Sequence, residues 1–129
     1  MAAAAHDAEM ITLAKRFFAA IVAGDIEAVR SCYTLDATVW HNTDGMSQSV
    51  DENLRVLSWI ATNVKNFHYE DVRCQPTPTG FVQQHLTCGT SPGGRPFAIP
   101  ACIVCAVVDG RVARVDEYLD STQTAAITG

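Results

Sequence analysis

The chain has 129 residues, which fits one domain over residues 1–129. Its 48% hydrophobic and 18% charged residues support a substantial core and argue against disorder. The formal net charge of −5 argues against nucleic acid as a partner, because nucleic-acid binding needs a basic face. No apolar run approaches the roughly 18 residues of a membrane span, and the first residues lack the regions of a signal peptide. We therefore expect a cytoplasmic protein with no membrane partner.

The first part of the sequence predicts helices. Apolar residues recur at helical spacing over residues 7–23, where Asp7 can serve as the N-cap, and Gly24 suits the left-handed residue after the last turn. Asp25 then caps a second, shorter helix. Ser49 and Glu52 form a capping box that opens a third helix, expected to run to about residue 65.

The remaining sequence has the period of two that is typical of strands. Residues 34–42 predict a strand that delivers His41 to the apolar interior. Further strands are predicted over residues 67–74, 81–90, 95–108 and 111–120, and Asp109-Gly110 forms the turn between the last two. The small, polar tail from Ser121 is expected to be loosely held. Helices followed by a meander of strands predict an α+β fold, with three N-terminal helices on a strongly curved, mainly antiparallel sheet.

Four short motifs carry a resemblance to a known superfamily: Ala23-Gly24-Asp25, Asp36-Ala37-Thr38-Val39, Asp109-Gly110-Arg111 and Asp116-Glu117-Tyr118-Leu119-Asp120. With the order of elements over about residues 8–121, they resemble the nuclear transport factor 2-like superfamily. The chain looks most like its SnoaL-like group, which is related to ketosteroid isomerases and limonene-epoxide hydrolases. The resemblance implies a cone-shaped α+β barrel of the cystatin-like type, a deep hydrophobic pocket and a homodimer formed through the outer face of the sheet. Because this superfold hosts many functions, the motifs report the fold more than the activity.

The resemblance also places individual residues. His41 falls where the isomerases carry a proton-shuttling carboxylate and the hydrolases a water-orienting Asn, and Glu117 matches the catalytic Asp of the hydrolases. Phe17 replaces the oxyanion-hole Tyr of the isomerases, and about Ile103 replaces its Asp partner. The Arg-x-Asp pair of the hydrolases has no counterpart; the nearest residues are Gln84, His85 and Thr87. Neither mechanism can therefore be transferred whole.

Three titratable residues are the candidate catalytic groups: His41, Glu117 and His85. The imidazole of His41 titrates near neutrality and shares a strand face with Val39, although a hydrogen-bonded core histidine has the same pattern. The carboxylate of Glu117 shares an apolar face, which raises the pKa of a carboxyl unless it is paired. A Glu117–His41 pair would resemble a base and its orienting group. His85 either supplies a second imidazole or lies on the surface or the dimer face.

Seven apolar residues are the candidate substrate-binding wall: Phe17, Val39, Trp40, Trp59, Ile103, Val115 and Leu119. Trp40 and Trp59 are alternatively packing residues. We expect no cofactor and no metal, because His41, His85 and Glu117 show no ligand-spacing motif. The Cys102-x-x-Cys105 pair has no second pair, so its cysteines fit small buried residues of a reducing compartment better than a metal or redox site.

The sequence supports two functions. One is a cofactor-free enzyme of the isomerase, cyclase, dehydratase or epoxide hydrolase type, which performs general acid–base chemistry on a small apolar molecule in the pocket. The other is a non-catalytic module for ligand binding or dimerisation, which the missing family residues favour. An enzyme should hold His41 and Glu117 within hydrogen-bond reach of each other or of one empty volume.

Overall fold

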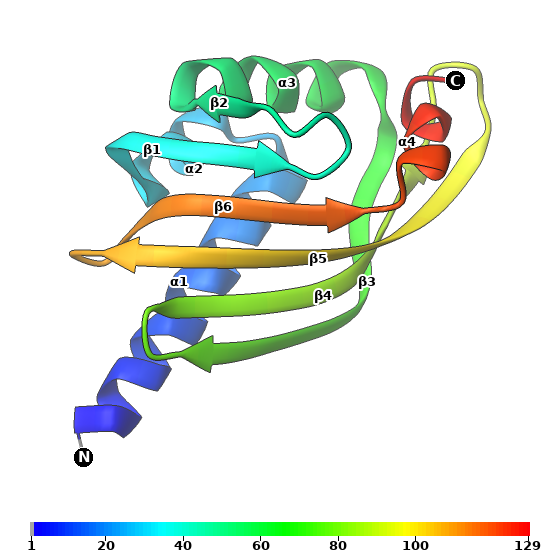
Figure 1. Ribbon diagram of the computed structural model, residues 1–129. Coiled ribbons are helices and arrows are strands. Elements are labelled where there is room, and N and C mark those ends of the chain that lie inside the picture. The colour runs from blue at the N-terminus through cyan, green and yellow to red at the C-terminus, as the bar shows by residue number, and fades with distance from the viewer. Residues whose placement is uncertain (1) are drawn as a thin grey trace.

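The computed structural model describes residues 2–129. The elements in chain order are α1 (Ala2–Ala23), α2 (Ile26–Cys32), β1 (Tyr33–His41), β2 (Ser47–Ser49), α3 (Val50–Asn63), β3 (Lys65–Thr77), β4 (Gly80–Thr90), β5 (Pro96–Val108), β6 (Arg111–Leu119) and α4 (Ser121–Thr128). The strands form one open sheet in the order β2-β1-β6-β5-β4-β3 (Figure 1). Neighbouring strands are antiparallel except β1 and β6, which run parallel. The α+β prediction is confirmed, with a mixed sheet that is not closed.

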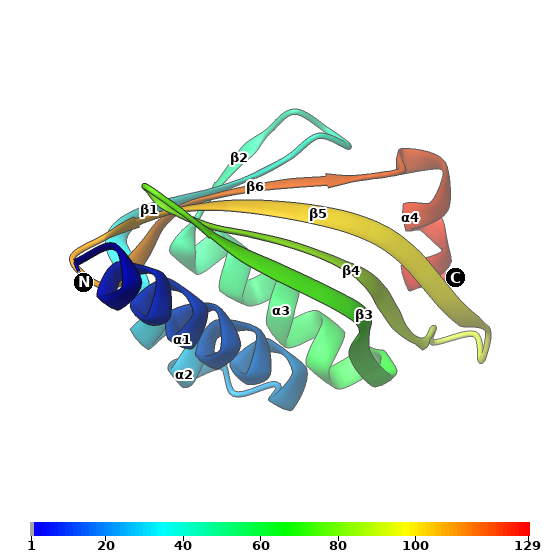
Figure 2. The same cartoon turned by 90° about the horizontal axis from the view of Figure 1, so that it is seen from below.

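The first three helices cover one face of the curved sheet, as the view in Figure 2 shows. Buried residues of α1 recur at helical spacing and point toward the sheet: Met10, Leu13, Ala14, Phe17 and Phe18. They pack with inward-facing residues of β1, β4, β5 and β6 into the main core, which includes Val39, Phe81, Ile103 and Val115. The covered, concave face of the sheet is therefore where the interior of the protein lies.

Several local signals predicted the element boundaries correctly. The capping box is present, since the Ser49 side chain accepts from the backbone N–H of Glu52, and the Glu52 side chain accepts from that of Ser49. Gly24 directly follows the last residue of α1, and its φ of 69° is the left-handed conformation predicted for the end of this helix. Asp109 and Gly110 have φ values of 51° and 75°, which suit the tight turn between β5 and β6.

The two ends of the chain differ from the predictions. The described part of α1 begins at Ala2, so Asp7 lies inside the helix and is not its N-cap; the preceding alanines are strong helix formers. The tail forms a fourth helix that was not predicted, because the Asp120 side chain accepts from the backbone N–H of Thr122 and caps α4. Ile127 of α4 packs against a second cluster that contains Phe97 and Ile99.

The sheet also has features that the periodicity did not indicate. The short β2 pairs with β1, and β3 continues through Pro76 to Thr77. A proline fits there because β3 is an edge strand, so its missing N–H breaks no second ladder. None of the helices in residues 2–129 combines the length and apolar character needed to cross a bilayer.

Candidate functional site

The parallel contact between β1 and β6 brings two of the predicted site residues together. His41 and Glu117 are direct partners in the register of these strands. His41 Nε2 lies 2.8 Å from Glu117 Oε1, and each side chain is 21% exposed. The alternation of strand side chains puts Val39 on the same side as His41, and Val115 on the same side as Glu117. The ion pair therefore sits at the concave face, among apolar residues.

Asn42 extends this contact beyond the end of β1. Its backbone N–H donates to the carbonyl oxygen of Glu117 at 3.0 Å, and its side-chain Oδ1 accepts from the backbone N–H of Leu119 at 2.9 Å. These bonds continue the pairing of the two strands past His41. They fix the position of the His41 backbone relative to the Glu117 backbone.

The pair changes the protonation of His41. The hydrogen bond with Glu117 raises the pKa of His41 above its ordinary value, and this effect outweighs burial, which lowers the pKa. The carboxylate accepts the proton on Nε2 whether the imidazole is neutral or charged. The neutral ring then carries its lone pair on Nδ1, which is the nitrogen able to accept a further proton.

A cavity of about 210 Å³ adjoins the pair. Its wall is mostly aliphatic and aromatic, with contributions from α1, α3, α4 and the inner face of the sheet. The polar side chains His41, Glu117, Asn53 and Thr87 also reach it. Five of the residues expected to form an apolar wall line the cavity: Phe17, Val39, Ile103, Val115 and Leu119.

The two tryptophans do not line this cavity, contrary to the prediction. Trp40 points to the outer face of the sheet, where its ring packs edge-on against Tyr118 with centroids 5.4 Å apart. This follows from the alternation along β1, which places neighbours of His41 on the opposite face. Trp59 is 39% exposed on α3, because the buried side of that helix runs through Val50 and Leu54 instead.

His85 is buried behind the cavity wall and not on the surface. Only 2% of it is exposed; its ring stacks on Tyr69 with centroids 4.1 Å apart and meets Phe18 edge-on. Burial lowers the pKa of His85 to about 4, so the ring is neutral near neutral pH. The Gln83 side-chain amide donates to Nδ1 at 3.0 Å, which leaves the proton on Nε2, a buried atom without a partner in the described chain. Tyr69 lines the cavity, so His85 lies one layer behind it.

The sequence favours burial of Tyr33 with a hydrogen-bonded hydroxyl at the cavity, but it does not identify the partner of that hydroxyl. The Tyr33 hydroxyl donates to Asn53 Oδ1 at 2.8 Å, and burial raises the pKa of Tyr33 far above its ordinary value. The hydroxyl is therefore a neutral donor whose proton is held by Asn53. The available signal was Asn53 itself, a polar residue on the helix stripe that also contains Val50 and Leu54.

The comparisons with known proteins agree with this architecture. The family model of the SnoaL-like domain matches residues 14–115. No curated protein sequence matches the chain.

Among solved structures, the chain is similar to a protein described as a candidate polyketide cyclase from Xanthomonas campestris pv. campestris. That match has a TM-score of 0.83 and 15% identity, and it covers 95% of this chain and 99% of the other. An uncharacterised protein with a ketosteroid isomerase-like fold from Catenulispora acidiphila, in complex with trimethylamine, matches with a TM-score of 0.78, 14% identity and coverage of 91% and 92%. An LEH-like epoxide hydrolase from M. tuberculosis matches with a TM-score of 0.76, 17% identity and coverage of 92% and 88%. At these identities the likeness establishes the fold alone.

Proposed function

The chain belongs to the family of SnoaL-like domains, and on this premise we propose that it is a cofactor-free enzyme that transfers a proton to or from a small, mostly apolar molecule. The observation that carries the proposal is the 2.8 Å contact between His41 and Glu117 at an apolar cavity. An ionisable pair is costly to bury, and such pairs concentrate at active sites.

In the proposed mechanism His41 is the proton-transfer group and Glu117 orients it. Glu117 accepts the Nε2 proton, so Nδ1 of the neutral imidazole takes a proton from the substrate or from a water. The resulting imidazolium is stabilised by the carboxylate at 2.8 Å. The proton then returns to a different atom of the reacting molecule. The mostly apolar wall lowers the local dielectric and so strengthens this electrostatic interaction.

The cavity sets the class of substrate in this proposal. Its rings and aliphatic side chains suit a hydrocarbon skeleton, and its volume of about 210 Å³ favours a compact molecule. The Asn53 amide and the hydroxyls of Thr43, Thr87 and Thr124 are neutral polar groups that can orient a substrate oxygen. Isomerisation, cyclisation, dehydration and epoxide opening all fit one base beside such a wall. The names of the cyclase-like and epoxide hydrolase neighbours fall within this range.

The test is a turnover screen of epoxides, enones and short polyketide-like compounds with the wild type and His41→Gln. Removal of a general base should lower kcat by roughly 10²–10⁴-fold with a smaller change in KM. Asp116→Asn is the matched control, because Asp116 neighbours Glu117 on the opposite face of β6 and pairs with Arg114. It should retain wild-type turnover. Turnover that survives His41→Gln would contradict the assigned role, and binding without turnover across all three classes would favour the ligand-binding module.

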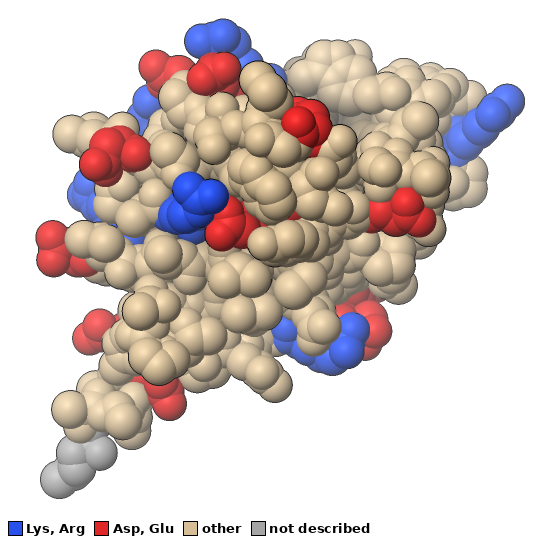
Figure 3. Space-filling view, viewed as in Figure 1, with Lys and Arg blue, Asp and Glu red and all other residues tan. Residues whose placement is uncertain are grey.

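We also propose that two copies associate through the outer face of the sheet. Val104 and Tyr118 are 39% and 46% exposed there, and most of the face in Figure 3 carries neither acidic nor basic side chains. Light scattering should report a dimer for the wild type and a monomer for Val104→Lys, since association would take a charged ammonium group out of water. A monomeric wild type would refute the association.

A further inference from the structure

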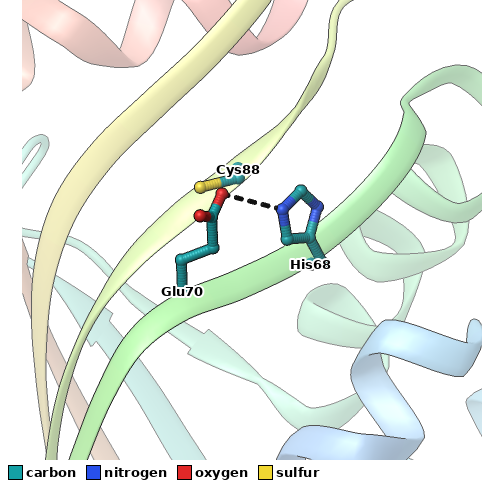
Figure 4. A group of neighbouring side chains, drawn as sticks. All are labelled: His68, Glu70 and Cys88. Atoms are coloured by element: carbon teal, nitrogen blue, oxygen red, sulfur yellow. Dashed lines mark hydrogen bonds and ion pairs between the residues drawn. The ribbon is translucent and has the colours of Figure 1, made fainter.

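Three potential metal ligands meet on the opposite face of the sheet from the cavity. His68 of β3 pairs directly with Cys88 of β4, and Glu70 lies two residues along on the same face of β3. One ligand atom from each residue lies within 4.8 Å of the other two. Figure 4 shows the Glu70 carboxylate between the Cys88 thiol and the His68 ring.

The hydrogen bonds of His68 require a positive charge beside Nε2. Nδ1 lies 2.6 Å from the backbone carbonyl oxygen of Asn66, so Nδ1 carries a proton and donates it. Nε2 lies 2.9 Å from Glu70 Oε2. A neutral ring would then direct its Nε2 lone pair at a carboxylate. The contact is favourable only with a second proton on the ring or with a cation shared by Nε2 and Glu70.

We propose that His68, Glu70 and Cys88 bind a divalent metal ion of the zinc class. Imidazole nitrogen, carboxylate oxygen and thiolate sulfur are the three ligand types that Zn²⁺ takes in proteins. Metal-bound histidines usually donate their other ring N–H to a carbonyl or carboxylate, as Nδ1 of His68 does to Asn66. The carboxylate and the thiolate together balance the two charges of the ion.

The geometry needs little rearrangement to close around an ion. Metal–ligand bonds of about 2.0–2.3 Å in a tetrahedral site place the ligand atoms roughly 3–4 Å apart. The present separations of at most 4.8 Å are close to that range. Three protein ligands leave the fourth position to a water. On binding, the Cys88 thiol and Nε2 of the protonated His68 ring each lose a proton to solvent, and the sulfur and Nε2 then bond the ion.

A bound ion would cross-link β3 to β4. β3 is an edge strand that pairs only with β4, and the ligands come from both strands. An ion that binds the folded state and not the unfolded chain stabilises the fold by mass action. The cluster lies on the opposite face from His41 and Glu117, so the proposal is independent of the proposed activity.

The test is titration of the full-length, chelator-treated protein with Zn²⁺ and with Co²⁺. One ion per chain should bind, raise the melting temperature and, for Co²⁺, give a thiolate charge-transfer absorption band. His68→Gln, Glu70→Gln and Cys88→Ser should each weaken binding by more than the roughly 10–100-fold that loss of an outer-shell partner costs. Cys88→Ser should also abolish the thiolate band.

Cys102→Ser is the control, because Cys102 is a half-buried cysteine on β5 away from this cluster. It should keep the wild-type affinity and absorption band. Cys88 is buried, so Cys88→Ser can destabilise the fold. Glu70 is exposed, so Glu70→Gln should remain folded and test the site without that effect. Failure of the wild type to bind either ion would overturn the proposal, as would affinities in His68→Gln and Glu70→Gln that equal the wild type.

Discussion

His41 Nε2 and Glu117 Oε1 lie 2.8 Å apart because β1 and β6, widely separated in sequence, run parallel with these two residues in register. The other strand pairs in the described sheet are antiparallel. The pair thus depends on the one contact of the sheet that a hairpin could not supply. A charged pair created by this long-range contact is the structural basis of the proposed proton transfer.

The buried bond between Tyr33 and Asn53 should contribute measurably to stability. Tyr33→Phe removes the donor and leaves Asn53 Oδ1 without its 2.8 Å partner. We expect the free energy of unfolding to fall by about 1–3 kcal/mol, the cost of an unsatisfied buried polar group. The change in the free energy of unfolding is measured by urea titration, with circular dichroism as the signal.

A double variant separates this bond from the loss of packing. Tyr33→Phe with Asn53→Leu replaces both polar groups by apolar ones and should be more stable than the sum of the single changes predicts. Strict additivity in this cycle would show that the two side chains do not interact. Equal stability of Tyr33→Phe and the wild type would refute the bond's contribution.

The buried His85 should make the fold sensitive to mild acid. Its pKa is about 4 in the folded chain but about 6.5 when unfolded, so protons bind preferentially to the unfolded state between these values. Stability is therefore unaffected by this group above pH 6.5 and is lost as pH falls toward 4. Since one pKa unit corresponds to about 1.4 kcal/mol, the fall from 6.5 to about 4 removes up to about 3 kcal/mol.

His85→Phe provides the comparison, because a phenyl ring fills a similar space between Tyr69 and Phe18 without titrating. Unfolding free energies measured at pH 7 and pH 4.5 should differ less in this variant than in the wild type. Carboxylates elsewhere contribute equally to both proteins, so they cancel in the comparison. The same pH dependence in both proteins would show that folding does not lower the pKa of His85.

Helix α4 should close one end of the cavity without holding the fold together. Thr124 and Ile127 line the cavity, and the described residues of α4 include no buried ones. Truncation after Asp120 should lower the free energy of unfolding by no more than about 2 kcal/mol, the scale of one apolar side chain. It should increase the fluorescence of an apolar dye such as anilinonaphthalene sulfonate, which reports exposed apolar surface. Unchanged dye binding would show that α4 does not cover the cavity.

Local signals in the sequence predicted most of the fold. The Ser49–Glu52 capping box and the Asp109-Gly110 turn act between near neighbours, so their residue types are sufficient to predict them. Strand alternation likewise placed Val39 and His41 on one face. The helix α4 was missed because its polar residues show no apolar stripe, and its start depends on a single capping side chain, Asp120.

Contacts that depend on the register between strands could not be predicted from the sequence pattern. The metal-ligand cluster joins Cys88 to His68 and Glu70 only because β3 and β4 pair with His68 opposite Cys88, a relation that no spacing along one strand reveals. Trp59 was misplaced for a related reason, since the face that α3 buries depends on its position over the sheet. The catalytic roles of His41 and Glu117 stay predictions, although the structure brings their side chains into contact.

The central claim is that Glu117 controls the protonation of His41, and an NMR titration of the His41 ring in the wild type, Glu117→Gln and Asp116→Asn tests it directly. The Glu117 hydrogen bond raises the pKa of His41, so the pair stabilises the fold fully below pH 6.5 and loses this contribution as pH rises through the folded pKa. We predict that the pKa lies above about 6.5 in the wild type, falls in Glu117→Gln and stays unchanged in Asp116→Asn. A His41 that does not titrate, or whose pKa is the same in all three proteins, would contradict the account.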